Sequence, residues 1–449
     1  MFAHSLLNGS RFGFCLGNCA TVRQWNLSTA FRQARNFHTH SKVKLKPMNT
    51  CQPIGRWYSR FAPLCRSGTV TIRNALVSTG RSMTTSSEVV ADRLVAGIPS
   101  FGRKMVGGWL ILCSGMVVGA VVLGGVTRLT ESGLSMTDWH LIKGMKAPRS
   151  AEEWAAEFER YKQYPEYKLL HHEMTLEEFK WIFYMEYTHR MWGRAIGLVF
   201  ALPAVYLWRK GWFSKAMKPR VIIYGSLILF QGLLGWYMVK SGLEEPKGEY
   251  DVPRVSQYRL ASHLGSALLL YTLMLWTGLG HLLPQAKVPA VTSRYLPLLR
   301  KSAHFTLALV FVTALSGAFV AGLDAGLVYN SFPKMANKWI PDDILAFEPK
   351  WKNFFENATT VQFDHRVLGS TTAGVVLALW YLSRRVPLHS RARIAVNCMI
   401  GMVGLQVSLG ILTLLYYVPT KLAACHQSGS VALLTFTLWF LRELKKIPK

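Results

Sequence analysis

Long apolar stretches constrain the fold of this chain more than any other feature. Apolar side chains gather into runs that approach about 20 residues, among them residues 108–126, 221–239, 303–322 and 405–418. A helix of that length spans the hydrocarbon core of a bilayer. Only 17% of the residues are charged, whereas soluble domains carry about 25%. We therefore predict an all-α polytopic membrane protein, and the pattern excludes a set of soluble domains.

The distribution of these runs predicts eight membrane-spanning helices. They cover approximately residues 108–129, 189–208, 221–240, 259–283, 302–323, 364–383, 394–417 and 424–441. Three loops contain Lys and Arg but no acidic residue: 209–220, 285–301 and 384–393. Two others are rich in Asp and Glu: 130–188 and 241–258. Basic loops stay on the side of the membrane from which the chain is inserted, so the two kinds of loop lie on opposite sides.

The N-terminal segment has a different composition from the rest of the chain. Residues 1–87 contain 12 Lys and Arg, many Ser, Thr and Asn, and no Asp or Glu. A segment rich in Arg and Ser and free of acid is typical of a mitochondrial transit peptide. The alternative is a disordered basic tail. We predict that residues 1–80 are a disordered transit peptide and exclude them from the fold.

The charge pattern also predicts the location of the protein. The formal net charge of +28 comes from the N-terminal segment and the basic loops, so it gives no reason to expect a nucleic-acid partner. In a mitochondrion the side of insertion is the matrix. We therefore predict a multi-pass protein of the inner membrane, with both termini in the matrix and the acidic loops facing the intermembrane space.

The two halves of the chain resemble each other. In order, the matches pair ESGL at 131–134 with DAGL at 324–327, EYTHR at 186–190 with QFDHR at 362–366, QGLLG at 231–235 with QVSLG at 406–410, and ASHLGS at 261–266 with ACHQSG at 424–429. Four matches in the same order are not a chance result. An even number of spans in each half gives both halves the same orientation. We predict two tandem, pseudo-symmetric four-helix bundles, at residues 100–283 and 302–445.

Four histidines lie within the predicted spans: His189, His263, His365 and His426. Each begins an even-numbered span, so all four are expected at the same depth, near the intermembrane space. An ionisable side chain in a span is costly and usually faces the interior of a bundle. A single such histidine would most simply be a hydrogen-bonded packing residue. Two pairs at matching places in a duplicated chain favour a ligand role.

The chemistry of the donors narrows the choice of ligand. Two neutral imidazoles from facing helices suit the axial positions of a haem iron. Zinc normally recruits three or four protein ligands. A di-iron bundle needs Glu-x-x-His on two helices, and the second half has Gln362 where the first has Glu186. We therefore predict two haem sites, His189 with His263 and His365 with His426.

Three charged residues beside these histidines are further candidates. Arg190 and Arg366 directly follow the first histidine of each pair, where they could bind a haem propionate or anchor the helix at the interface. Glu186 precedes His189 by one helical turn on the same face. It could handle protons in a reaction, or be a surface glutamate at the interface.

These motifs together resemble the haem A synthase family. The resemblance covers residues 100–445 and rests most of all on GGVTRLTESGLSM at 124–136. It also rests on EYTHR at 186–190, YNSFPKM at 329–335, QFDHR at 362–366 and the two remaining histidines. Some bacterial members carry a pair of cysteines in an outward loop, and this chain has none there. A thiol relay is therefore not carried over from those members.

The resemblance implies an oxidoreductase that acts on haem O as its substrate. Members of the family oxidise a methyl group of haem O to the formyl group of haem A, by successive hydroxylation, for cytochrome c oxidase assembly. By this resemblance His189 and His263 bind the substrate, with Glu186 as the catalytic acid. His365 and His426 bind a permanent haem b cofactor.

The resemblance also implies partners, and two other functions remain open. A ferredoxin is the expected electron donor, haem O synthase and oxidase assembly factors are possible partners, and a homo-oligomer is possible. One alternative is a dihaem b-type electron carrier, which needs the same four histidines but has no haem product. The other is a haem-binding assembly chaperone that changes nothing chemically.

Overall fold

The structure is a computed structural model that describes residues 94–138, 146–244, 253–283 and 291–447. All of them belong to one compact unit, Gly80–Lys449. The predicted transit peptide, residues 1–80, lies outside the described ranges. Within those ranges the regular structure is helical, and the one isolated β-bridge joins Met335 to Lys338.

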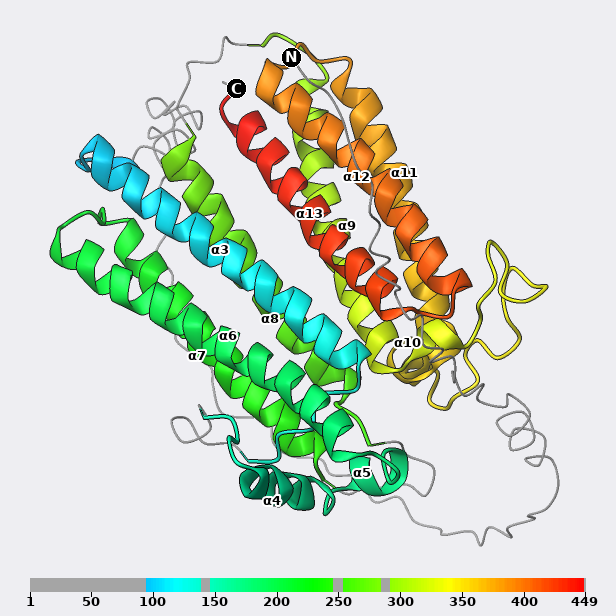
Figure 1. The fold of residues 1–449 in the computed structure, drawn as a ribbon. Coiled ribbons are helices and arrows are strands. Elements are labelled where there is room, and N and C mark those ends of the chain that lie inside the picture. Colours follow the sequence, from blue (N-terminus) through cyan, green and yellow to red (C-terminus); the bar gives the residue numbers. More distant parts are fainter. Residues whose placement is uncertain (1–93, 139–145, 245–252, 284–290, 448–449) are drawn as a thin grey trace, which may run out of the picture. The chain divides into compact units, whose positions relative to one another are not determined.

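Eight long helices account for most of the described chain (Figure 1). They are α3 (Ser100–Leu129), α6 (Leu176–Arg209), α7 (Met217–Gly242), α8 (Gln257–Leu282), α9 (Leu296–Gly322), α11 (Ala358–Ser383), α12 (Ser390–Leu415) and α13 (Thr420–Lys445). Short helices occupy two of the connections: α4 (Ala151–Tyr161) and α5 (Pro165–Leu170) precede α6, and η2 (Ala325–Leu327), η3 (Lys350–Lys352) and α10 (Asn353–Glu356) precede α11.

Six of the long helices in the described ranges are apolar and long enough to cross a membrane: α3, α6, α7, α8, α9 and α12. The all-α polytopic prediction is therefore confirmed. Helices α11 and α13 are long enough to cross a membrane, but their most apolar stretches are less apolar than those of the other six. Both have polar residues at one or both ends, such as Asp364 and Arg366 in α11 and Lys421 and Arg442 in α13. These residues lower the mean hydropathy of the two helices.

Helix α6 is longer than its predicted span of 189–208. It has 34 residues, and at about 1.5 Å per residue it exceeds a hydrocarbon core of about 30 Å. It begins at a capping box in which Thr175 and Glu178 satisfy each other's backbone N–H groups. His189, which was expected at the start of the second span, lies well inside α6.

The long helices form two sets of four neighbours. In the first set α3 packs against α6 and α8, and α7 completes the circuit by packing against the same two helices. In the second set α9 packs against α11 and α13, and α12 likewise contacts both. Helices α3 and α8 of the first set meet α9 and α13 of the second (Figure 1). One hydrophobic core cluster extends through both sets.

The internal repeat has a counterpart in the backbone. Glu131 follows α3 with φ 51°, and Asp324 follows α9 with φ 52°. A left-handed conformation is uncommon for residues other than glycine. These two residues are equivalent in the ESGL and DAGL matches, so both halves leave their first helix through the same unusual turn.

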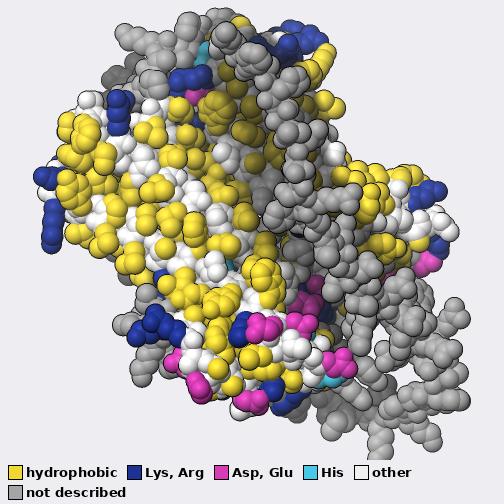
Figure 2. All heavy atoms as spheres, viewed as in Figure 1, with side chains coloured by type: hydrophobic (Ala, Val, Ile, Leu, Met, Phe, Trp, Pro, Cys, Tyr) yellow, Lys and Arg dark blue, Asp and Glu magenta, His cyan; other side chains and the backbone are white. Residues whose placement is uncertain are grey.

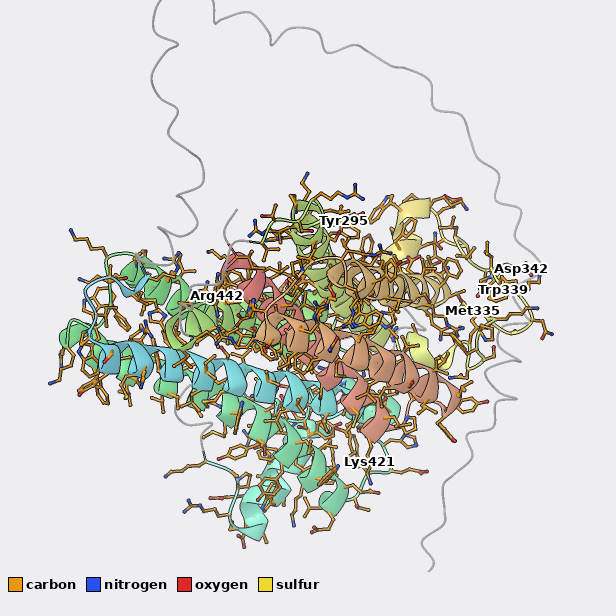
Figure 3. The ribbon with its side chains drawn as sticks, turned by 90° about the horizontal axis from the view of Figure 1, so that it is seen from above. Tyr295, Met335, Trp339, Asp342, Lys421 and Arg442 are labelled. Atoms are coloured by element: carbon orange, nitrogen blue, oxygen red, sulfur yellow. The ribbon has the colours of Figure 1, made fainter. Side chains whose placement is uncertain are left out.

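The surface separates apolar from charged side chains. Hydrophobic side chains cover the middle of the face in Figure 2, and acidic side chains gather at the end where α4 and α5 lie. Helix α4 is attached to α6 by an aromatic cluster that includes Trp154, Tyr161 and Phe179. Met335, Trp339 and Asp342 belong to the long loop between α9 and α11, which projects at the end of the helices away from Arg442 (Figure 3).

Candidate haem-binding sites

The second histidine pair faces the interior of its set of helices. His365 comes from α11 and His426 from α13, two helices that both pack against α9 and α12. The centres of the two imidazole rings are 6.3 Å apart, and the ring planes are nearly perpendicular. Two imidazoles that bind one metal ion through bonds of about 2 Å have ring centres roughly 6 Å apart. The spacing of this pair therefore fits one shared iron.

Glycines from the other two helices border these rings. A Cβ atom added to Gly317 of α9 would lie 3.3 Å from Cε1 of His365, and one added to Gly410 of α12 would lie 3.0 Å from Cε1 of His426. The hydroxyl of Ser316 lies 2.7 Å from Nδ1 of His365. Any larger side chain at the two glycine positions would crowd the imidazoles, so the small residues keep room for a planar group.

The first histidine pair repeats this arrangement. His189 of α6 and His263 of α8 lie close enough to interact electrostatically. A Cβ atom added to Gly124 of α3 would lie 3.0 Å from Nε2 of His189, and one added to Gly235 of α7 would lie 3.5 Å from Cε1 of His263. Gly124 and Gly235 are the repeat counterparts of the glycines in the second set. The structure therefore brings both predicted pairs together in matching surroundings.

A glutamine accompanies the second histidine of each pair. The side-chain amide nitrogen of Gln231 donates to Nδ1 of His263 at 2.9 Å and to the backbone carbonyl of His263 at 3.2 Å, while its oxygen accepts from the backbone N–H of Ala267. Its repeat counterpart, Gln406, donates to the backbone carbonyl of His426 at 2.9 Å. The Oε1 atom of Gln406 and Nδ1 of His426 are both buried without a hydrogen-bond partner among the described residues.

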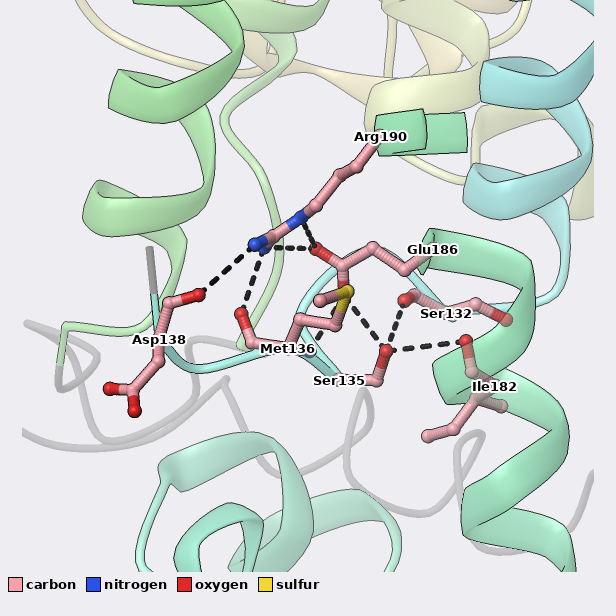
Figure 4. A network of polar contacts seen from close by, with 7 residues as sticks. All are labelled: Ser132, Ser135, Met136, Asp138, Ile182, Glu186 and Arg190. Atoms are coloured by element: carbon pink, nitrogen blue, oxygen red, sulfur yellow. Dashed lines mark hydrogen bonds and ion pairs between the residues drawn. The ribbon is translucent and has the colours of Figure 1, made fainter. Parts of the chain in front are cut away.

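Glu186 is buried in a polar network rather than exposed at the interface (Figure 4). Only 2% of its surface is exposed. Oε2 accepts hydrogen bonds of 2.8 Å from the hydroxyl of Ser135 and from the backbone N–H of Met136. Oε1 accepts from Nε of Arg190 at 3.0 Å, and the two side chains form an ion pair. The interfacial interpretation of Glu186 was therefore wrong.

Arg190 belongs to the same network. Its guanidinium also donates to the backbone carbonyls of Met136, at 2.8 Å, and Asp138, at 3.2 Å. Glu186 and Arg190 together hold the loop after α3 against α6. A haem propionate at Arg190 would therefore compete with an ion pair inside the protein.

The second half holds its corresponding loop with the same two positions. Gln362 is buried, and its amide nitrogen donates to the backbone carbonyls of Ala325, at 2.8 Å, and Tyr329, at 3.2 Å. Its oxygen accepts from Arg366 at 3.1 Å. Arg366 also donates to the carbonyls of Tyr329 and Ser331, at 2.8 and 2.9 Å. The loop after α3 thus presents donors to a carboxylate, whereas the loop after α9 presents acceptors to an amide.

Sequence reasoning identified the four histidines but missed these supporting contacts. The long motif at 124–136 could have indicated these contacts. It contains Gly124, which lies beside His189, and it contains Ser135 and Met136, which donate to Glu186. In the part of the chain that the structure describes, no group of three or more His, Cys, Asp or Glu side chains could hold a metal ion. A haem iron needs only the two axial imidazoles.

Comparison with known proteins gives one family. A family model described as cytochrome oxidase assembly protein matches residues 107–438. The chain is 61% identical over 368 residues to human heme A synthase COX15, which covers 81% of this chain and 89% of the relative. It is 44% identical to heme A synthase COX15 of Saccharomyces cerevisiae, with 76% of each chain covered. It is 45% identical to heme A synthase of the bacterium Nitrosospira multiformis, with 77% and 94% covered.

Proposed function

The chain belongs to the cytochrome oxidase assembly protein family, and on that premise we propose that it is a mitochondrial haem A synthase, a membrane-embedded oxidoreductase that converts haem O to haem A. The observation that carries the proposal is the second histidine pair, whose ring spacing of 6.3 Å fits a bis-imidazole iron. The first pair, with the same bordering glycines, gives a second place for a haem. A synthase needs both, one for its cofactor and one for its substrate.

The two haems are assigned to the two sets of helices. His365 and His426 would hold a resident haem b, and His189 and His263 would hold the substrate haem O. Haem b, when bound, supplies a one-electron redox centre. Ser316 would orient the imidazole of His365 through its Nδ1 atom, and Gln406 holds the backbone carbonyl of His426. A ferredoxin in the matrix is the electron donor that we propose.

Glu186 is the proposed catalytic acid of the substrate site. It lies one turn before His189 in α6 and keeps an ionisable carboxyl group in a buried place. A group that is both buried and ionisable can move protons during oxidation of the substrate's methyl group. Arg190 and the loop after α3 hold the carboxylate in one orientation.

The membrane arrangement proposed for this function has eight spans in two four-helix bundles. The circuit of contacts within each set of helices supports it, as does the matching turn at Glu131 and Asp324. Both termini would lie on the matrix side of the inner membrane, and the haem sites would lie toward the intermembrane space. The resemblance to haem A synthases also implies partners. We propose haem O synthase, oxidase assembly factors and a second copy of the chain.

Extraction of the haems from the purified protein tests this function against the carrier and the chaperone. Mass spectrometry should find haem b together with haem O and its oxidised derivatives. Haem b alone at two sites would support the electron carrier. Variable and weakly held haem, with no oxidised derivative, would support the chaperone.

A further inference from the structure

Four titratable side chains near the start of α6 contact one another in series. The phenolic oxygen of Tyr161 in α4 lies 3.0 Å from Oε2 of Glu166 in α5. The same oxygen lies 2.7 Å from Nδ1 of His171. On the other side of that ring, Nε2 of His171 lies 3.8 Å from Oε2 of Glu131, at the end of α3. None of the four has a role in the function proposed above.

Burial decreases along this series. Tyr161 is fully buried and Glu166 is 5% exposed. The side chain of His171 is 17% exposed and that of Glu131 is 57% exposed. One end of the series is therefore enclosed by protein, and the other end is in contact with water.

The enclosed end lies within electrostatic range of Glu186. Burial, together with the charges of Glu186 and Glu131, raises the pKa of Glu166 to about 8, against the opposing effects of the hydrogen bond from Tyr161 and the charge of Arg128. Burial and the carboxylates of Glu166, Glu186 and Glu131 also raise the pKa of Tyr161. Glu166 therefore keeps its proton at neutral pH, and a change of charge at Glu186 alters its affinity for that proton.

We propose that Glu166, Tyr161, His171 and Glu131 form a proton-transfer chain between the aqueous surface and the buried surroundings of Glu186. The proposal rests on the function proposed above. With the proton on Glu166, its O–H donates to the oxygen of Tyr161, and the O–H of Tyr161 donates to Nδ1 of His171. When both protons move by one hydrogen bond, Glu166 becomes a carboxylate and His171 an imidazolium, and Tyr161 is unchanged. The Nε2–H of His171 then passes its proton to water, directly into the bulk or through one water molecule to Glu131, whose Oε2 lies 3.8 Å away.

The proposed reaction requires such a route. Oxidation of a methyl group to an alcohol releases two protons and two electrons when water supplies the oxygen. It consumes two protons and two electrons when dioxygen supplies it. In either case protons must cross between bulk water and a buried site. A chain of three hydrogen-bonding groups that starts at a protonated acid can carry them in either direction.

The competing interpretation is purely structural. Tyr161 stacks on Phe179 with ring centres 5.1 Å apart, and a neutral Glu166 could serve only to satisfy its hydroxyl. Tyr167 gives a matched control, because its ring packs against Tyr161 in the same cluster while its hydroxyl donates to the backbone carbonyl of His172. Tyr161→Phe and Tyr167→Phe each delete one hydroxyl and keep the aromatic ring. Only the first interrupts the chain.

The test compares these variants in the full-length protein loaded with haem. Conversion of haem O should fall about tenfold or more in Tyr161→Phe and Glu166→Gln and stay unchanged in Tyr167→Phe. Equal falls in the two tyrosine variants, or full turnover in Glu166→Gln, would assign the series to structure and overturn the proposal.

A second measurement does not depend on turnover. Infrared spectroscopy of the resting protein should show a carboxylic-acid band that Glu166→Gln removes and that disappears as the pH rises through about 8. The proton of that band should exchange with deuterium more slowly in Tyr161→Phe than in Tyr167→Phe. Absence of the band at neutral pH, or equal exchange rates in the two tyrosine variants, would overturn the proposed proton-transfer chain. This result can be read even if the unsubstituted protein makes no haem A, an outcome that would instead overturn the proposed function.

Discussion

At the scale of single residues, the difference between Glu186 and Gln362 has a structural cause as well as a proposed chemical one. Each side chain matches the hydrogen-bonding groups of the loop that it holds, donors in the first half and carbonyls in the second. The sequence indicated that the difference was informative. It could not reveal the loop contacts, because the partners of Glu186 are about 50 positions away in the chain and depend on tertiary packing. The same is true of the series at Tyr161.

Reciprocal exchange of these two residues separates the roles. In Glu186→Gln the amide nitrogen must face either Arg190 or the N–H and O–H groups of the loop after α3, all of which are donors. In Gln362→Glu a carboxylate faces carbonyl oxygens. We expect each variant to lose about 1–3 kcal/mol of stability, measured by thermal unfolding. Only Glu186→Gln should also lower the haem A to haem O ratio per folded protein, by about 10²-fold or more. A normal ratio in that variant would confine Glu186 to holding the loop.

At the scale of helices, hydropathy predicted where the long helices lie but not where they begin. Apolar composition is a local property, and six of the long helices in the described ranges contain an apolar stretch long enough to cross a membrane. The first turns of α6 mix charged with aromatic residues and pack against α4, so a search for apolar runs began this helix at residue 189. The histidine pairs were predictable because the repeat aligns them. The bordering glycines were not, because helix packing explains a glycine equally well.

Replacement of one bordering glycine tests the close approach of helices at the first site. Gly124→Ala places a methyl group 3.0 Å from Nε2 of His189, one of the two residues proposed to hold the substrate haem. We expect it to lower occupancy of the substrate site by at least about tenfold, while haem b at the second site is retained. Gly115→Ala in the same helix is the control, because a Cβ atom there meets nothing within 4 Å. Equal haem content in the two variants, measured by extraction, would contradict the assignment of the substrate haem to His189 and His263.

Removal of one imidazole tests the second site. In His365→Ala or His426→Ala the iron would lose one of its two axial ligands, so stable haem b and its reduced-state absorption should disappear. His304→Ala in α9 is the control. His304 lies near the start of α9, far from Gly317 at the haem site, and its Nδ1 atom is hydrogen-bonded to the backbone carbonyl of Arg300. A normal bis-histidine spectrum in either of the first two variants would show that His365 and His426 are not the two axial ligands of haem b.

At the scale of the whole molecule, charge divides the two ends of the helices. From residue 93 onward, Glu443 is the only acidic residue outside the segments 131–186, 244–251 and 324–364. Those three segments begin where α3, α7 and α9 end, so the described residues Glu131, Glu244 and Asp324 lie at one end of the helices. Glu443, at the other end, is fully buried and paired with His389 and Lys446, at 2.8 and 3.0 Å. The end opposite the acidic segments therefore presents almost only positive charge.

Labelling of single cysteines tests the orientation that this asymmetry predicts. In a chain whose own cysteines are replaced by serine, Glu173→Cys lies in the acidic segment before α6, and Lys215→Cys lies in the basic loop before α7. Both side chains are exposed. Since basic loops stay on the side of insertion, a membrane-impermeant maleimide should label position 173 once the outer membrane is opened. Position 215 should react only after the inner membrane is dissolved. The reverse order would place the acidic segments, and the ends of the helices that carry His263, His365 and His426, in the matrix.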